Sequence, residues 1–304
     1  MICSKSTAAQ LSILLCNIVW ACDYPFYNLV LGNYVSPLAM VAASLAVAAV
    51  WSLVPLLWER CERVEPDDRI KIVGAALLMG ISKKMLMMYG LSQTSPIDGS
   101  IIGTTTPLLV LLLSAFVGVE RFTKMKLAGL LLGMAGAVAV IISSRGGEHD
   151  HSGIVGNILI FGSSCVSAIY MVYFKGLITK YRITTLLRWI YCTSAVIMLP
   201  IGAHDIITTN FSAMTADVIF AALFVLIVPT YLPNLLLHYS LRWVAPTLTS
   251  IYAYIQPVVA IALAVAMGLD TLHVDTILFA VAIFVGVGLV VYAYRAEGTK
   301  KPAR

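Results

Sequence analysis

Two adjacent lysines, Lys83 and Lys84, lie inside an apolar run that extends from residue 70 to residue 91. A helix over this run rises about 1.5 Å per residue and would hold both lysines about 11 Å or more from either end. If the run crosses a membrane, charge at that depth is costly and usually functional. We therefore expect at least one lysine to contact a substrate carboxylate or phosphate, or a coupling ion. Pairing with an internal acid, or extension to the outer interface, is the structural alternative.

Two further ionisable groups fall inside apolar runs. Asp23 lies in the run 9–31, where its carboxylate could carry a coupling proton or neutralise one of the lysines. Arg188 lies near one end of the run 184–202, where it could extend to the inner interface or bind an anionic group. Both residues are predicted to act as coupling groups or charge partners.

Hydroxyls and amides in other apolar runs could complete such a site. Tyr252 and Gln256 are four residues apart and would share one face of a helix. The candidates predicted to bind substrate beside the lysines are Tyr89, Tyr231, Asn234, Tyr252 and Gln256.

Proline spacing predicts where the helices are irregular. Pro229 and Pro233, four residues apart, predict a local break that frees backbone carbonyls, which membrane proteins tolerate where the backbone lines a cavity. Pro107 and Pro257 lie in the middle of two other apolar runs and predict kinks. Kinks would let helix halves rock, although plain packing explains them equally well.

Other kinds of chemistry find no support in the sequence. It contains no nucleophile–base pair, phosphate-binding loop or metal-ligand cluster, and the six cysteines have no CxxC spacing. The net charge of +5 comes from basic residues at the ends of apolar runs, which is not a nucleic-acid footprint. We expect no enzyme activity, cofactor, metal or nucleic-acid partner.

The composition places these residues in a membrane. The chain is 60% hydrophobic and 12% charged, whereas a soluble domain carries roughly 25% charged residues. Apolar runs of about 18 or more residues indicate spanning helices. Ten such runs are predicted, at 9–31, 36–58, 70–91, 96–118, 125–143, 153–174, 184–202, 216–240, 246–268 and 274–294.

The basic residues predict the orientation of these spans, because basic loops stay cytoplasmic. Of the 20 Lys and Arg residues, Lys83, Lys84 and Arg188 lie within spans, whereas Lys71 and Lys126, each the second residue of its run, are counted with the adjoining loops. If the N-terminus is cytoplasmic, Arg145 is the one remaining basic residue in an outer loop. Both termini are therefore predicted to be cytoplasmic in a multi-pass protein of the cell (inner or plasma) membrane.

A repeat with an offset of 150 residues organises the chain. An odd number of helices per copy would make the two copies lie upside down to each other, as in many transporters with a site at the membrane midplane. We predict a first five-helix unit at 1–145, a second at 150–296 and a basic cytoplasmic tail at 297–304. The matched pairs are Tyr89/Tyr239, Leu91/Leu241, Pro96/Pro246, Ser100/Ser250, Pro107/Pro257, Glu120/Asp270 and Gly136/Gly286.

The repeat also assigns roles to unlike positions. Glu120 and Asp270 fall at turns between spans, where a carboxylate can cap the next helix, so both are predicted to be structural. The offset aligns Lys83-Lys84 with Pro233-Asn234. Symmetry should bring these two segments to facing sides of one site.

The repeated block resembles a known family. Pro107, the turn Gly118-Val-Glu-Arg-Phe-Thr123 and the following Gly129, Gly133 and Gly136 are similar to the EamA repeat of the drug/metabolite transporter superfamily. The second copy, from Tyr239 through Pro257 to Gly268-Leu-Asp270, has Asp in place of Glu. The resemblance covers nearly the whole chain. It implies an all-α integral membrane fold of ten helices in a 5+5 inverted repeat, with a central cavity.

The resemblance also implies alternating access without ATP. From it and from the deep lysines we expect a secondary transporter of a small polar metabolite with an anionic group, such as an amino acid or organic acid. Its expected partners are the lipid bilayer, the solute and a coupling proton, and it would act as a monomer or homodimer. The alternatives are a non-transporting membrane scaffold or receptor, and a drug or cation exporter of the same fold.

Overall fold

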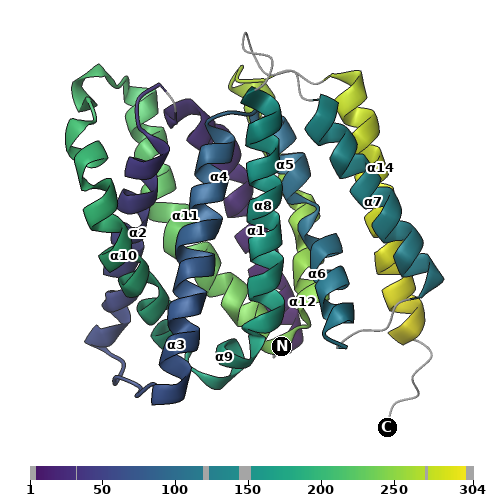
Figure 1. Ribbon diagram of the computed structural model, residues 1–304, viewed down its shortest axis with the longest axis horizontal. Helices are drawn as coiled ribbons and strands as arrows, with labels where there is room; N and C mark the ends of the chain where they lie inside the picture. Colours follow the sequence, from purple (N-terminus) through teal and green to yellow (C-terminus); the bar gives the residue numbers. More distant parts are fainter. Residues whose placement is uncertain (1–4, 32, 119–122, 144–151, 271–272, 299–304) are drawn as a thin grey trace.

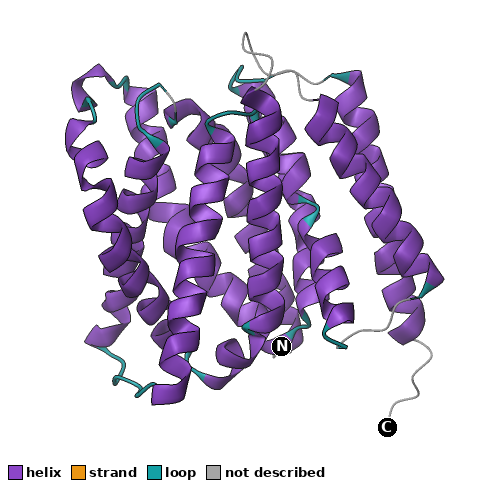
Figure 2. Ribbon diagram, viewed as in Figure 1, coloured by secondary structure: helices purple, strands orange, loops and turns teal. Residues whose placement is uncertain are grey.

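The computed structural model describes residues 5–31, 33–118, 123–143, 152–270 and 273–298. Nearly all of these residues are helical, as Figure 2 shows, and the described part of the chain holds no strand beyond an isolated bridge between Leu31 and Val35. The helices of the first half are α1 (Lys5–Val30), α2 (Pro37–Leu53), η1 (Val54–Leu57), α3 (Pro66–Ala75), η2 (Ala76–Ser82), α4 (Lys83–Leu91), α5 (Pro96–Gly103), α6 (Thr106–Phe116) and α7 (Lys124–Ser143).

The second half of the chain is also helical. Its helices are α8 (Ser152–Tyr173), α9 (Lys175–Lys180), α10 (Ile183–Thr208), η3 (Phe211–Ala213), α11 (Ala216–Trp243), α12 (Pro246–Ile251), η4 (Tyr252–Tyr254), α13 (Ile255–Ala266) and α14 (Val274–Gly298). Glu120, Arg121 and the boundary segment 144–151 lie outside the described residues.

Eight helices within the described ranges are long and apolar enough to cross a membrane. Two of the predicted runs are not among them. The run 70–91 is helical, but it carries Lys71, Lys83 and Lys84 and is interrupted by η2. The run 274–294 lies in α14, whose apolar stretch, Ile277–Ala293, is shorter.

Helices begin where serine and proline specify a start. Ser36 and Ser95 are in extended backbone, and each hydroxyl accepts a hydrogen bond, from the N–H of Ala39 and of Asp98 respectively, both at 3.1 Å. A proline follows each serine, at a position whose N–H would have no helical partner. These caps fix the first turns of α2 and α5.

The two mid-run prolines interrupt their helices, as predicted. The run that contains Pro107 breaks between α5 and α6, at Thr104 and Thr105. The run that contains Pro257 passes through the 3₁₀ turn η4 between α12 and α13. Each break directly precedes its proline, because proline cannot donate the helical hydrogen bond.

The predicted break at Pro229 and Pro233 is wrong, since α11 runs without interruption through both. Pro229 leaves the carbonyl of Val225 without its helical donor, and the Thr230 hydroxyl (2.9 Å) and the Tyr27 hydroxyl (3.5 Å) donate to it instead. Side chains thus satisfy the freed carbonyl, and the helix continues.

The irregular backbone lies instead in η2, a π-helical segment directly before the lysines. The hydroxyl of Ser194 on α10 donates to the carbonyl of Ala76 at 3.1 Å. Gly80 lies against the same serine so closely that a Cβ there would clash with the hydroxyl. The π-helical hydrogen bonding of η2 therefore occurs where α10 packs closely against it and where Ser194 supplies a donor to its backbone.

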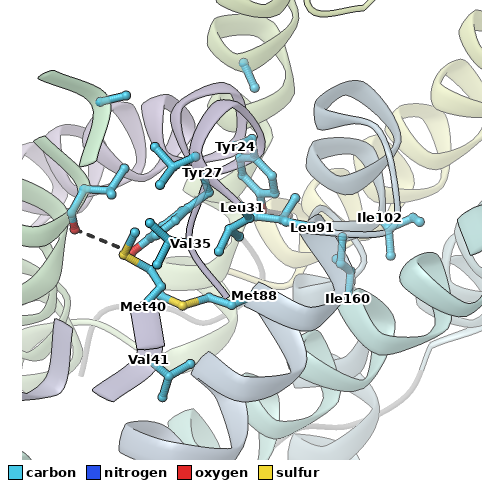
Figure 3. Packing of buried hydrophobic residues seen from close by; sticks show 14 of the residues in the cluster. Tyr24, Tyr27, Leu31, Val35, Met40, Val41, Met88, Leu91, Ile102 and Ile160 are labelled. Atoms are coloured by element: carbon cyan, nitrogen blue, oxygen red, sulfur yellow. Dashed lines mark hydrogen bonds between the residues drawn. The ribbon is translucent and has the colours of Figure 1, made fainter. Parts of the chain in front are cut away.

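The helices pair in a pattern with internal symmetry (Figure 1). The main pairs are α1 with α11, α4 with α8, α2 with α10, and α7 with α14. α1 begins at the lower edge of the view, whereas α8 begins at the upper edge. Figure 3 shows part of a buried hydrophobic cluster that includes Tyr24 and Tyr27 of α1 and Met88 and Leu91 of α4.

Glycines bring α7 and α14 into backbone contact. A Cβ on Gly286 would lie 2.5 Å from the nitrogen of Gly133 and 2.6 Å from the oxygen of Gly129. Gly136 likewise lies against the carbonyl of Phe279. Gly288 is the exception, since no described atom lies within 4 Å of a Cβ placed there.

Candidate functional site

A cavity of about 120 Å³ lies where α1, α4, α8 and α11 meet the two interrupted helices. Lys83, Lys84, Asp23, Asn234 and Gln256 all line it. The structure therefore brings together both predicted lysines, the predicted carboxylate and the two predicted amides. Pro229 also lines this cavity, although its helix is unbroken.

The two ammonium groups are held by different walls. The Nζ of Lys83 lies 4.3 Å from the ring centroid of Trp20, a cation–π contact. The Nζ of Lys84 donates to the hydroxyl of Ser44 at 3.0 Å. Both partners are neutral, so each lysine keeps its positive charge available to a third group.

Asp23 is 5% exposed, and its Oδ1 has no hydrogen-bond partner among the described atoms. Both lysines act on this carboxylate electrostatically, but within the described chain no ion pair of 4.0 Å or less joins them to it. A buried oxygen without a partner is costly. The arrangement therefore leaves room for a proton, a water molecule or a solute between the charges.

A chain of hydrogen bonds fixes Gln256 beside the carboxylate. Its Nε2 donates to the side-chain oxygen of Asn17 at 2.6 Å, and its Oε1 accepts from the hydroxyl of Tyr24 at 3.2 Å. Gly103 makes room for that hydroxyl, since a Cβ there would lie 2.5 Å from it. Gln256 is thus held in one orientation by contacts with α1.

Asn234 offers a free acceptor. Its Nδ2 donates to the carbonyl of Thr230 at 3.0 Å, whereas its Oδ1 is buried and has no partner in the described part of the chain. A solute with an N–H or O–H group could donate to this oxygen.

The cavity wall follows the 150-residue repeat. Lys84 of α4 and Asn234 of α11 are equivalent positions, and both line the cavity. The same holds for six further pairs, whereas Lys83, Lys84 and Asp23 all come from the first half of the chain. These pairs are Ile13/Ser163, Asn17/Ser167, Met79/Pro229, Met87/Leu237, Gly103/Ala253 and Thr106/Gln256.

Several predicted site residues lie elsewhere. Tyr252 faces outward and donates to the side chain of Gln10 at 3.2 Å, and Tyr89 is not part of the wall. The ring of Tyr231 lies 6.2 Å from that of Tyr191 at an interplanar angle of 58°, and Tyr191 rather than Tyr231 lines the cavity. Periodicity alone could not tell which tyrosines of these helices face inward.

Arg188 is also outside the cavity. It lines a separate groove beside α10, near the start of that helix. Its predicted role as a coupling group or charge partner therefore lies outside the cavity that holds Lys83, Lys84 and Asp23.

Sequence reasoning predicted Asp23 of α1 but did not assign the polar and aromatic residues beside it to the site. Asn17, Trp20, Tyr24 and Tyr27 recur at intervals of three or four residues and line the cavity from one face of α1. A search for polar and aromatic residues at helical spacing would have found this stripe.

His238 is a structural residue. Its Nε2 lies 2.5 Å from the hydroxyl of Tyr170, and its Nδ1 lies 2.6 Å from the carbonyl of Asn234. A carbonyl only accepts, so Nδ1 carries the proton and Nε2 accepts from the tyrosine. Both ring nitrogens are therefore satisfied by a neutral imidazole.

The turn residue Asp270 connects the two halves. One of its carboxylate oxygens accepts from the N–H of Ile97 at 3.3 Å, in the first turn of α5. The acid thus complements the N-terminal dipole of a helix in the other repeat.

A charged cluster joins the halves at the end of the bundle opposite Asp270. Asp68, at the start of α3, accepts from Lys180 (2.6 Å), Lys71 (2.8 Å) and the hydroxyl of Tyr181 (2.8 Å). These hydrogen bonds, that from Lys180 above all, hold the pKa of Asp68 well below its usual range. Glu62 also accepts from the backbone N–H of Arg182 at 2.9 Å. The first-half loop is therefore attached to the second half here.

Comparison with known proteins gives consistent matches. A family model described as the EamA-like transporter family matches residues 7–142 and 154–292. An uncharacterized transporter of Archaeoglobus fulgidus is 22% identical over 262 residues, which cover 85% of this chain and 90% of the relative.

Two Bacillus subtilis proteins are also similar. The uncharacterized transporter YetK is 26% identical over 152 residues, 48% of this chain and 46% of that protein. The uncharacterized transporter YyaM is 22% identical over 260 residues, 84% of each chain. A solved crystal structure superposes with a TM-score of 0.68 at 16% identity, covering 94% of this chain and 98% of the other, which shows a shared fold.

Proposed function

Since the chain belongs to the EamA-like transporter family, we propose that it is a secondary transporter of a small polar solute that carries an anionic group, such as an amino acid or an organic acid. The chain is an integral, multi-pass membrane protein with helices that can span the bilayer. The substrate class is our inference from the cavity.

The observation that carries the proposal is the charge in that cavity. Lys83 and Lys84 present two cationic groups with neutral partners, against the single acid Asp23. An anionic group placed between them would balance the excess positive charge. The free oxygens of Asp23 and Asn234 would accept hydrogen bonds from an amine or hydroxyl on the same solute.

The size of the cavity favours this solute over a drug. Pockets for drug-sized ligands measure roughly 300–1,000 Å³, whereas this cavity measures about 120 Å³. A cationic drug would also meet two lysines. These features argue against the exporter of drugs or cations as the alternative function.

We propose that transport proceeds by alternating access in a ten-helix, 5+5 inverted repeat divided near residues 145–150. The equivalent helix pairs α1 with α11 and α4 with α8, and the lining positions that differ by 150 residues, support this symmetry. The helix breaks before Pro107 and Pro257 would act as hinges. In such a cycle the cluster around Asp68 would close one end of the cavity.

We further propose that both termini are cytoplasmic, that the membrane is the inner or plasma membrane, and that Asp23 carries a coupling proton. The distribution of basic residues supports the orientation. The partnerless oxygen of Asp23 supports the proton site.

Transport and binding assays test the proposal. Purified protein is screened by thermal shift against small anionic and cationic metabolites, since a ligand at 100 times its Kd stabilises by about 2.7 kcal/mol. Any hit is then assayed for flux in proteoliposomes. We expect Lys83→Met and Lys84→Met to lose both the shift and the flux, whereas Lys124→Met, a change at an exposed lysine outside the cavity and the Asp68 cluster, keeps both.

Two results would contradict this reading. Normal transport by both cavity variants would exclude the anion site. Binding without flux for every hit would favour the scaffold or receptor.

A further inference from the structure

A second hollow lies on the outer face of the bundle, away from the cavity. It is a groove of about 1060 Å³ between the segment 61–69 and one side of α10. Arginines line one part of the groove and apolar side chains of α10 line the other. We define the arginine groove by Arg63, Arg69 and Arg188, with Trp189, Val196 and Ile197.

The arginine groove carries an excess of positive charge, because three arginines line it together with two glutamates, Glu62 and Glu65. None of the three guanidinium groups has a hydrogen bond or ion pair to another described residue. The carboxylates nearby are engaged elsewhere, since Glu62 accepts from the N–H of Arg182 and Glu65 pairs with Lys180 at 2.5 Å. Clustered guanidinium groups suit a phosphate, which they bind through paired N–H donors.

The apolar part of the groove faces the lipid. Val196 is 73% exposed and Trp189 is 37% exposed on a helix that is apolar enough to cross a membrane. From Arg188 to Ile197 the helix rises about 13 Å, so the groove runs from the interface toward the middle of the bilayer. Tryptophan and arginine side by side are typical of the headgroup level.

We propose that the arginine groove binds an anionic phospholipid. Its phosphate would lie among Arg63, Arg69 and Arg188, and an acyl chain would lie along Trp189, Val196 and Ile197. A basic pocket at the end of a helix bundle, open to the bilayer, has the charge and polarity of such a ligand. The proposal does not depend on which solute the cavity carries.

The arginine groove lies beside the contacts that join the two halves of the chain, so a bound lipid would affect transport. The segment that carries Arg63 also carries Glu62 and Asp68, which attach the first half of the chain to the second. A bound phosphate would neutralise the repulsion among the three arginines in this segment and α10. It would thereby stabilise the attached arrangement of the two halves.

The test uses the full chain in nanodiscs and detergent. Protein in nanodiscs with equal amounts of phosphatidylglycerol and phosphatidylcholine is transferred to mild detergent, and retained lipid is counted by native mass spectrometry. We expect at least tenfold enrichment of phosphatidylglycerol. The combined variant Arg63→Gln, Arg69→Gln, Arg188→Gln should lose the enrichment, and Arg242→Gln, an equal change outside the groove, should keep it.

A second measurement covers the case in which the combined variant fails to fold. In wild-type protein the melting temperature is measured with added phosphatidylglycerol, phosphatidylcholine or inorganic phosphate. Stabilisation by phosphatidylglycerol alone supports the proposal. Equal retention or equal stabilisation by the two lipids would overturn it, as would an enrichment that survives in the combined variant. An equal effect of inorganic phosphate would make the groove a free-anion site and would also overturn it.

Discussion

The contact between α7 and α14 allows one substitution to be predicted in detail. In Gly286→Ala the new Cβ would lie 2.5 Å from the nitrogen of Gly133, 2.6 Å from the oxygen of Gly129 and 2.8 Å from the Cα of Gly133. All three are backbone atoms, so no side-chain rotation can relieve the clash. To reach ordinary contact at 3.4 Å, the two helices must separate by roughly 0.8 Å.

The cost of that separation can be estimated against a control in the same helix. Overpacking of this kind costs about 1–3 kcal/mol, and alanine recovers up to about 1 kcal/mol of helix propensity. Gly288→Ala gains the same propensity without a clash, since no described atom lies within 4 Å of its new Cβ. The difference between the two variants therefore isolates the packing cost, which we expect to be about 1–3 kcal/mol.

Thermal unfolding in detergent measures this difference. At roughly 2–4 °C per kcal/mol for a chain of this order of size, Gly286→Ala should melt several degrees below Gly288→Ala. Equal melting temperatures would refute the close contact of the two helices.

Three further predictions concern the cavity and the charged cluster. Gly103→Ala should displace the Tyr24 hydroxyl, 2.5 Å from the new Cβ, and reduce flux in proteoliposomes several-fold without a loss of folded protein; unchanged flux would place this wall outside the pathway. Asp68→Asn should lower the melting temperature at neutral pH. Hydrogen bonds from Lys180 lower the folded-state pKa of Asp68, so its contribution is present above the ordinary carboxyl pKa of about 4 and is lost as the pH falls through the lowered value. The two melting curves should then converge in acid, and a constant gap would contradict this. Asp23→Asn should abolish accumulation driven by a pH gradient but spare exchange of labelled for unlabelled solute, whereas loss of exchange would assign the acid to balancing the lysines.

The helices could be predicted from the sequence because a segment that crosses the lipid must be apolar over about 20 residues and must satisfy its own backbone hydrogen bonds. Apolar runs such as 216–240 correspond to helices such as α11, and Pro107 and Pro257 marked real interruptions. The backbone of the third run could not be predicted. Its π-helical segment depends on the approach of Ser194 to Ala76, a contact between residues more than a hundred positions apart.

The candidate site was partly predictable for a similar reason. Lys83, Lys84 and Gln256 stood out because polar groups are rare in apolar runs. Tyr89 and Tyr252 shared that property but face elsewhere, since the rotation of each helix is set by its packing. Applying the offset of 150 to the correct candidate Gln256 would have identified Thr106, which also lines the cavity.

The π-helical segment η2 also adds one residue to the helix that runs from α3 to α4. A π-helical segment corresponds to an α-helix with one residue inserted, so every residue after it occupies the place of its predecessor in a regular helix. Deleting one residue within 76–82 would regularise the helix and leave both ammonium groups where they are. If the intact segment slipped into α-helical bonding, α4 would turn by about 100°, and Lys83 would take the place that Lys84 now holds beside Ser44. A single shift of register at η2 would thus bring Lys83 to Ser44 and move Lys84 to the place that Met85 now holds.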